Sequence, residues 1–300
     1  MKPNTKPISE VYKELKVFSK MNKKSDFFYH YTTLVPLLKI IDSKVIRFSD
    51  CKYLNDTSEL DHGLKKVRDL LQKEIEKLKK SQLSREVYRN KLFKLLGGLS
   101  PIDPEFPSHY VFCLCEKIDL LSQWRGYSKD KCPIALKFRI ERIGSIKKCP
   151  NTFLFKVIYN EEKQDKIITK IVENFLQSNC TEKEDEEKLL FQTKLALFLT
   201  AIYFKHHGFE EEQEWRFMYF CNPKKNKSRK IHFDNSKELY LFPYVTFEFS
   251  ELFPKSKGNA IKEITVGPQR HSLSKRSLSE YLELNNINIP VVESKIPYRT

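Results

Sequence analysis

Short apolar and aromatic runs recur along this chain, and their spacing predicts a protein with many strands. Runs of about four to ten residues rich in aromatic and β-branched side chains are typical of buried or half-buried strands. Such runs lie at 27–32, 45–49, 110–115, 133–140, 153–159, 215–220, 240–249, 261–266 and 289–292.

Helices are predicted where apolar residues return with a period near 3.6. This pattern occurs at 8–21, 34–41, 60–80, 85–96, 181–205 and 272–286. The segment 181–205 has too many apolar residues for one narrow stripe, so we expect it to be largely buried. Strands and helices follow each other without regular alternation, which indicates an α+β fold.

Composition supports a folded chain with a large core. The 300 residues are 40% hydrophobic and include 22 Phe. Only 8 Gly are present, and neither GxGxxG nor GxxxxGK[ST] occurs, which argues against the nucleotide-binding folds that need such loops. The seven Cys form no CxxC pair, and no apolar run is long enough for a signal peptide or a membrane span. We therefore expect a cytoplasmic protein with reduced thiols and no membrane contact.

The formal net charge of +15 leaves two interpretations open. It comes from 54 Lys and Arg against 39 Asp and Glu, and the segment 222–230, NPKKNKSRK, is strongly basic. Such an excess favours contact with a polyanion such as a nucleic acid. The alternative is a lysine-rich composition with solvated basic turns.

Candidate chemistry centres on residues 210–220, EEEQEWRFMYF. If the strand there begins at Glu212, then Glu212 and Glu214 project from the same face, as a catalytic carboxylate pair would. The alternative is a solvated acidic loop. His30 lies between two tyrosines in the first predicted strand, where a half-buried structural histidine is the common alternative to a ligand-binding one.

Seven short motifs, in order, carry a resemblance to a known family. They are YHYTT, RFSDCKYLNDTSE, FCLCE, LSQWRGYS, EEEQEWRF, ITVGP and SKIPYR, and the resemblance covers 27–299. The chain resembles the bacterial family catalogued as domain of unknown function 2971. That family is in turn distantly similar to the ADP-ribosyltransferase superfamily.

The resemblance implies an architecture and an activity. We expect a single domain, 1–300, with a split mixed β-sheet core formed by 27–59 and 105–299. Helical insertions would occupy 60–98 and 160–207. The implied reaction cleaves the nicotinamide–ribose bond of NAD and transfers ADP-ribose to a macromolecule, with nucleic acid a plausible acceptor from the net charge. Hydrolysis of NAD is the other outcome, and a role as a toxin or anti-phage effector, with a regulatory partner protein, would fit.

The resemblance also implies roles for individual residues. Glu214 would be the catalytic acid and Glu212 would position or deprotonate the acceptor, while His30 would hold a ribose. The remaining cofactor-binding candidates are Tyr31 or Ser49 in the middle role, Trp124 and Tyr127 beside the nicotinamide, and Arg125 at the pyrophosphate. The second-tier residues are Asn55, Asp56, Glu59 and Arg216; the first three alternatively cap the helix that follows.

Two rival functions remain from the residues themselves. One is a non-catalytic nucleic-acid-binding module, in which the basic surface is the function. The other is a metal-dependent nuclease, in which carboxylates gather a Mg²⁺ ion, although no nuclease motif accompanies them. The carboxylates concerned are Asp56, Glu59, Glu212 and Glu214.

Overall fold

The structure is a computed structural model of the 300-residue chain. It describes residues 27–53, 58–79, 86–100, 108–127, 132–140, 152–178, 182–220, 229–235, 240–253, 260–268 and 273–297, with residues 149, 180, 256 and 271. The predicted helix 8–21 lies outside this part of the chain. Two compact units are present: a helical unit, 1–20, 51–108 and 155–210, and a sheet unit, 21–50, 109–154 and 211–300.

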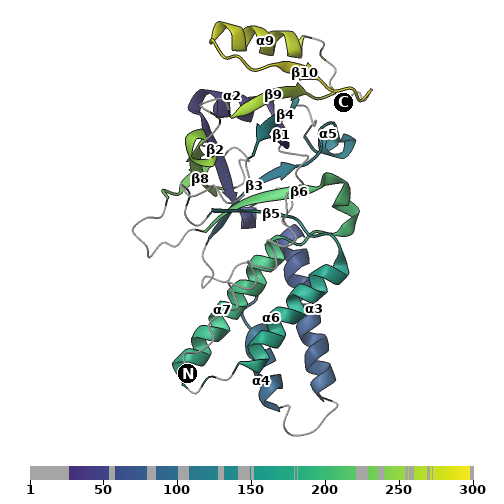
Figure 1. The fold of residues 1–300 in the computed structure, drawn as a ribbon, viewed down its shortest axis with the longest axis vertical. Coiled ribbons are helices and arrows are strands. Elements are labelled where there is room, and N and C mark those ends of the chain that lie inside the picture. Colours follow the sequence, from purple (N-terminus) through teal and green to yellow (C-terminus); the bar gives the residue numbers. More distant parts are fainter. Residues whose placement is uncertain are drawn as a thin grey trace. The chain divides into compact units, whose positions relative to one another are not determined.

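The sheet unit is built on a mixed, open β-sheet (Figure 1). Its strands are β1 (Phe27–Thr33), β2 (Val45–Asp50), β3 (His109–Cys115), β4 (Pro133–Arg139), β5 (Thr152–Lys156), β6 (Glu214–Phe220), β7 (His232–Asp234), β8 (Phe242–Glu248), β9 (Ile261–Val266) and β10 (Val291–Glu293). Their order is β10-β9-β4-β1-β3-β2-β8-β7, with β6 on β3 and β5 on β6. Strands β9 and β10 pair in parallel. The pairs β1–β3, β1–β4, β2–β3, β2–β8, β3–β6, β4–β9 and β7–β8 are antiparallel.

The sheet divides at β3, and we call this division the fork. One edge of β3 pairs along its whole length with β6. On the other edge, β2 pairs at Tyr110 and Val111, whereas β1 pairs at Cys115. In the described sheet neither strand forms a ladder with residues 112–114, so β1 and β2 leave the same edge of β3 at different points.

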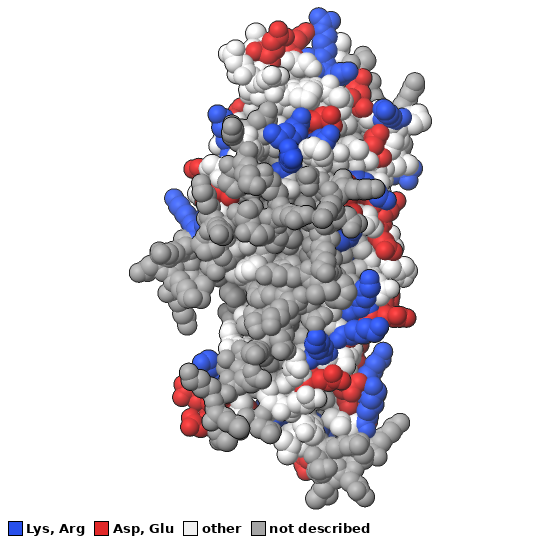
Figure 2. Space-filling view, in the orientation of Figure 1, with Lys and Arg blue, Asp and Glu red and all other residues white. Residues whose placement is uncertain are grey.

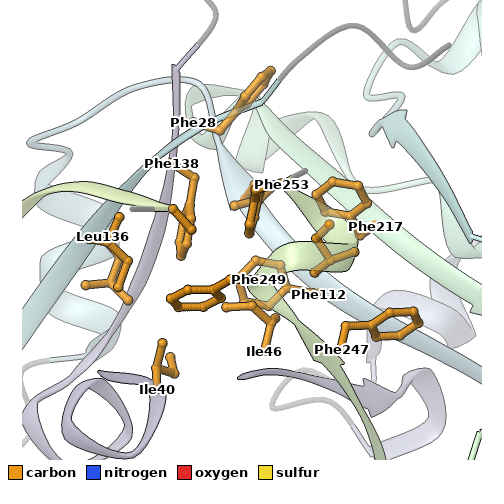
Figure 3. Close-up of a cluster of buried hydrophobic side chains, with 14 of the residues drawn as sticks. Phe28, Ile40, Ile46, Phe112, Leu136, Phe138, Phe217, Phe247, Phe249 and Phe253 are labelled. Carbon is orange, nitrogen blue, oxygen red and sulfur yellow. The ribbon is translucent and has the colours of Figure 1, made fainter. Parts of the chain in front are cut away.

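A large aromatic core fills one side of this sheet (Figure 3). Alternation along each strand sends every second side chain to this side. Short helices cover it: α2 (Leu34–Ser43), α8 (Phe249–Leu252) and α9 (Ser274–Leu284) each contribute buried apolar residues. The core includes Phe28, Ile40, Ile46, Phe48, Phe112, Leu136, Phe138, Trp215, Phe217, Val245, Phe247, Phe249 and Phe253. We call this side of the sheet the core face.

The helical unit contains α3 (Ser58–Lys79), α4 (Glu86–Leu96), α6 (Glu161–Gln177) and α7 (Lys183–Ile202) (Figure 1). The second half of α7 is buried on all sides, as its apolar content predicts, because α3, α4 and α6 all contact it. Close approach of α3 and α7 depends on Gly63, since an added Cβ would lie 2.3 Å from the carbonyl oxygen of Ala201.

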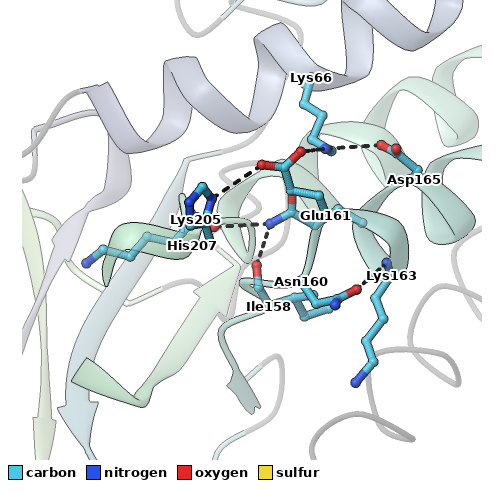
Figure 4. Close-up of polar contacts among 9 residues, drawn as sticks. Lys66, Ile158, Asn160, Glu161, Lys163, Asp165, Lys205 and His207 are labelled. Atoms are coloured by element: carbon cyan, nitrogen blue, oxygen red, sulfur yellow. Dashed lines mark hydrogen bonds and ion pairs between the residues drawn. The ribbon is translucent and has the colours of Figure 1, made fainter. Parts of the chain in front are cut away.

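Polar contacts fix the start of α6 in this unit (Figure 4). The Asn160 side chain caps the helix by accepting a hydrogen bond from the backbone N–H of Lys163 at 2.9 Å. Lys66 lies between the carboxylates of Glu161 and Asp165, at 3.5 and 3.2 Å. Buried Gln164 donates from Nε2 to two backbone carbonyls, which ties α6 to the residues that follow α7.

Most predicted strands are confirmed to within one to three residues at their ends. The predicted strand 153–159 stops at Lys156, because the cap at Asn160 starts a helix there. The predicted strand 240–249 is β8, which ends at Glu248, where the side chains of Glu248 and Glu251 form a capping box that begins α8. Strand β7 and helix α5 (Leu121–Tyr127) were not predicted, since neither segment has a long periodic pattern.

We predict that Gly63→Ala lowers the free energy of unfolding by about 2 kcal/mol, because the added methyl group has to push α3 away from α7. Chemical denaturation monitored by circular dichroism measures this change. Gly126→Ala is the matched control, since a Cβ at Gly126 meets nothing within 4 Å. Equal effects of the two substitutions would contradict the close approach at Gly63.

Candidate functional site

A buried ion pair lies at the start of β6. Arg216 donates from Nε to Glu214 Oε1 at 2.7 Å and from a terminal nitrogen to Oε2 at 3.0 Å. This bidentate arrangement fixes the orientation of both planar groups. Glu214 is 6% exposed and Arg216 is 2% exposed. They are two residues apart in the strand, so both project from one side of the sheet, the side opposite the core face.

The residues before Glu214 do not continue the strand. Glu212 ends a 3-10 helix, η4 (His207–Glu212), and Gln213 has a left-handed φ of 45°. Glu212 and Glu214 would share a strand face only if the strand began at Glu212; β6 begins at Glu214 and the chain turns between them, so they do not. A left-handed backbone is uncommon for glutamine and costs roughly 1 kcal/mol, so this turn needs support from its surroundings.

Tyr29 and Cys115 continue the row that begins with Glu214. The register pairs Glu214 with Cys115 across β6 and β3, and Cys115 with Tyr29 across β3 and β1. Residues paired in this way place their side chains on the same face. Burial, and to a smaller extent the carboxylates of Glu212 and Glu214, raises the pKa of the Cys115 thiol to about 12. The thiol is therefore protonated, and it donates to the backbone carbonyl of Glu212.

His30 lies at the fork as a neutral imidazole. Its Nδ1–H donates to the carbonyl of Cys113 at 2.9 Å. Cys113 lies in the part of β3 that forms a ladder with neither β1 nor β2. Burial lowers the pKa of His30 to about 4, and the hydrogen bond to Cys113 opposes this shift only in part. The other ring nitrogen, Nε2, is then an acceptor.

His30 and Glu214 leave the sheet on opposite sides. His30 pairs with Leu136 of the core, and its ring contacts Phe112 with centroids 4.3 Å apart. Glu214 instead shares the side of Tyr29 and Cys115. The resemblance assigns both side chains to one NAD molecule, but this register places them on opposite sides of the sheet.

Tyr31 and Trp124 form a packed cluster rather than an open wall. Trp124 is 0% exposed, its ring lies edge-on to Tyr31 at 4.8 Å, and a Cβ added at Gly267 would lie 2.6 Å from it. The Tyr31 hydroxyl donates to the carbonyl of Lys117 and accepts from the N–H of Leu120. Burial raises the pKa of Tyr31. The assignment of Trp124 to the nicotinamide is therefore corrected, because its ring surface is already covered.

Asp119, which no sequence pattern marked as a candidate, joins this cluster to the C-terminal segment. Its carboxylate accepts from the Trp124 indole N–H at 2.8 Å, from the backbone N–H of Lys295 at 2.8 Å and from the Ser294 hydroxyl. Asp119 itself has a left-handed φ of 65°, which aspartate tolerates better than most residues. The residues that donate hydrogen bonds to Asp119 all lie within the motifs LSQWRGYS and SKIPYR. This is the signal in the sequence that could have pointed to Asp119.

The remaining predicted site residues are dispersed. Ser49 is half-buried on β2, where it pairs with Val111. On α5, Arg125 is exposed and Tyr127 packs at the edge of the Trp124 cluster. Of the second-tier candidates, Asn55 and Asp56 before α3 lie outside the described residues, as does the side chain of Glu59 in the first turn of α3.

The described residues hold neither a cluster of metal ligands nor a membrane-spanning helix. No group of three or more His, Cys, Asp or Glu side chains gathers there in a way that would hold a metal ion. The helices in the same part of the chain include none with the length and apolar character needed to cross a membrane.

Comparison with known proteins finds one family model that matches part of the chain. Residues 123–217, from the first turn of α5 to the middle of β6, match the model of DUF2971, described as a protein of unknown function. The match supports the DUF2971 family. No curated protein and no solved structure matches the chain. The DUF2971 segment contains both Trp124 and the Glu214–Arg216 pair, so two features of the sheet unit lie within it.

We predict that Asp119→Ala lowers the free energy of unfolding by about 3 kcal/mol, because it leaves the buried Trp124 N–H without an acceptor. It also frees Ser294 and Lys295, so hydrogen exchange at 294–296 should rise. Asp42→Ala is the control, since Asp42 accepts one exposed hydrogen bond from Tyr281. Unchanged exchange at the C-terminal segment would contradict the role given to Asp119.

The depressed pKa of His30 predicts a specific pH dependence. Below the unfolded pKa of about 6.5 the unfolded chain binds a proton that the folded chain rejects until pH 4, so stability falls as pH falls through this window. Once the pH has fallen through both pKa values, the free energy of unfolding lost through His30 is on the order of 3 kcal/mol. Comparing denaturation at pH 7 and pH 4.5, His30→Asn should lose less stability than the native protein, whereas His271→Asn, at an exposed site, should not differ from it.

Proposed function

We propose that the protein is an ADP-ribosyltransferase-like enzyme that cleaves the nicotinamide–ribose bond of NAD, with Glu214 as its catalytic carboxylate. The observation that supports this is the buried Glu214–Arg216 pair, which directly follows the left-handed Gln213. Strained backbone and buried charge are features that proteins retain at functional sites.

The chemistry needs a fixed negative charge beside the sugar. As the bond between the ribose C1′ and the nicotinamide nitrogen breaks, the electron pair leaves with nicotinamide and positive charge builds on the ribose. A preoriented carboxylate stabilises that charge, typically by roughly 3 kcal/mol. The nucleophile of the acceptor then bonds to C1′ and loses its proton. Arg216 acts as a positioning residue, since its two hydrogen bonds hold the Glu214 carboxylate in one orientation.

The other groups of the proposal come from the side of the sheet that carries Glu214. Tyr29, half-buried in the same row, replaces His30 as the side chain nearest the sugar, because His30 points to the core face. Exposed Arg125 is the candidate for the pyrophosphate, and Glu212, partly exposed on η4, is the candidate base for the acceptor.

Nucleic acid is the proposed acceptor class because of the net charge of +15. On the face drawn in Figure 2, the described Lys and Arg residues are interspersed with Asp and Glu. The proposal for the acceptor therefore rests on the charge of the whole chain, and binding is expected to weaken as salt rises.

The test uses purified full-length protein with NAD labelled in its adenosine part, with and without total bacterial RNA, DNA and protein. Nicotinamide release reports cleavage, and label in macromolecules reports transfer. We predict that Glu214→Gln reduces nicotinamide release by about 100-fold or more. Glu211→Gln, exposed and outside the proposed site, is the matched control and should retain activity.

A folding control is needed, because Glu214→Gln leaves the buried Arg216 guanidinium without its carboxylate, a change that costs on the order of 3 kcal/mol. The double variant Glu214→Gln/Arg216→Met removes both charges and should be more stable than the single variant yet equally inactive. No nicotinamide release by the native protein, with salt-sensitive nucleic-acid binding intact in the double variant, would favour the binding-module alternative. Loss of activity in a folded His30→Asn variant would overturn the placement of substrate on the Glu214 side alone.

A further inference from the structure

The end of β3 holds the turn that leads into β6. The Cys115 thiol donates to the backbone carbonyl of Glu212, and the backbone N–H of Glu116 donates to the carbonyl of Gln213 at 3.2 Å. The Glu116 carboxylate accepts from the indole N–H of Trp215 at 2.6 Å. Two consecutive residues thus hold three of the four residues 212–215. We call these three contacts the clamp.

The clamp acts at the end of β6, which the sheet itself supports least. Strand β6 begins at Glu214, and its ladder with β3 ends there, at Cys115↔Glu214. The ends of a strand open more readily than its centre. Gln213, just before the strand, has a left-handed φ of 45°, which opposes an ordered turn. Contacts outside the ladder are therefore needed to keep the first residue of β6 in place.

The side chain of Glu116 reaches the strand through Trp215, on the core face. Trp215 is 1% exposed, and its ring lies edge-on to Phe28 with centroids 5.2 Å apart. A short hydrogen bond to a charged acceptor favours one orientation of the indole. Trp215 is the neighbour of Glu214 in the strand, so a fixed indole fixes the backbone from which the Glu214 side chain projects to the other side.

Two residues then orient the Glu214 carboxylate in different ways. Arg216 holds the carboxylate itself, and Glu116 holds the backbone beneath it. We propose that Glu116 is a positioning residue of this site, acting on Glu214 through its hydrogen bond to Trp215. The proposal rests on the proposed function of Glu214. A displacement of about 1 Å at a reacting group can lower a rate by about 100-fold, so a positioning residue of this kind is needed.

The clamp is tested first by a measurement that does not depend on activity. The chain contains two Trp, so the indole region of the proton–nitrogen NMR spectrum separates Trp124 from Trp215. We predict that Glu116→Ala shifts the Trp215 indole signal, because this proton loses a charged acceptor, and speeds hydrogen exchange at 214–216. The Trp124 signal should not move, since its N–H has a different acceptor.

Glu283→Ala is the matched control, because Glu283 is exposed on α9 of the same unit. It should move neither indole signal and leave exchange at 214–216 as it is in the native protein. An unchanged Trp215 signal in Glu116→Ala would overturn the clamp.

The second test separates positioning from a role of the charge. With NAD as substrate, Glu116→Ala should lower kcat for nicotinamide release by about tenfold or more and change KM less, because Glu116 positions the reacting carboxylate and does not bind the substrate. Glu116→Gln keeps a side-chain oxygen that accepts from Trp215, so it should restore most of kcat. If Glu116→Gln is as impaired as Glu116→Ala, the charge itself takes part in the reaction and the positioning role is wrong.

Failure of this proposal and failure of the proposed function give different results. No nicotinamide release by the native protein overturns the proposed function, while the indole and exchange measurements decide whether the clamp exists. Release at the native rate by Glu116→Ala leaves the proposed function in place and overturns the positioning role. Trp215→Phe removes the donor of the same hydrogen bond and is the second variant if Glu116→Ala does not fold; native kcat in Trp215→Phe likewise overturns the positioning role.

Discussion

The carboxylate of Asp119 is the group on which the arrangement of the sheet unit most depends. It accepts hydrogen bonds from the Trp124 indole, from the backbone of Lys295 and from the Ser294 hydroxyl, which belong to segments far apart in the sequence. Trp124 is completely buried, so its N–H needs an acceptor inside the protein. The same ring packs on Tyr31 and requires Gly267, because any Cβ there would collide with it. Four motifs that are far apart in the sequence thus meet around Trp124 and the carboxylate that it contacts.

The sequence was sufficient for the strands and insufficient for the site, for one physical reason. Burial of a strand leaves a local signal, and runs such as 261–266 and 110–115 are therefore close to the observed β9 and β3. Strand β7 has three residues, and its identity depends on pairing with β8, so no local pattern marks it. Helix α5 is likewise held by Trp124 and Asp119 rather than by amphipathic periodicity.

At the candidate site, single-residue register decides which side chains meet. The sequence identified Glu214 as the candidate acid but gave Arg216 only as a second-tier residue. Residues two apart on a strand share a face, and this spacing brings the two side chains together. His30 is the opposite case. Its position in the first strand is as the motif suggested, yet a strand sends adjacent residues to opposite sides, and Tyr29 and Tyr31 take the side of Glu214. The side of the sheet that a side chain faces depends on how distant strands pair, and the sequence does not show that pairing.

The energetics of β6 make a structural explanation for its charged face weak. A buried ion pair usually stabilises a fold no more than apolar residues of similar size, because desolvation offsets the attraction. Met218 occupies the next position on the same face, which shows that an apolar side chain fits this side of the strand. Trp215 and Phe217, on the core face, already anchor β6 to the sheet. Glu214 and Arg216 are therefore not needed to hold the strand, and they directly follow a glutamine in a left-handed conformation that also opposes stability. Two unfavourable features within four residues, in a strand that otherwise packs well, are the reason that the proposal for the reaction centres on Glu214.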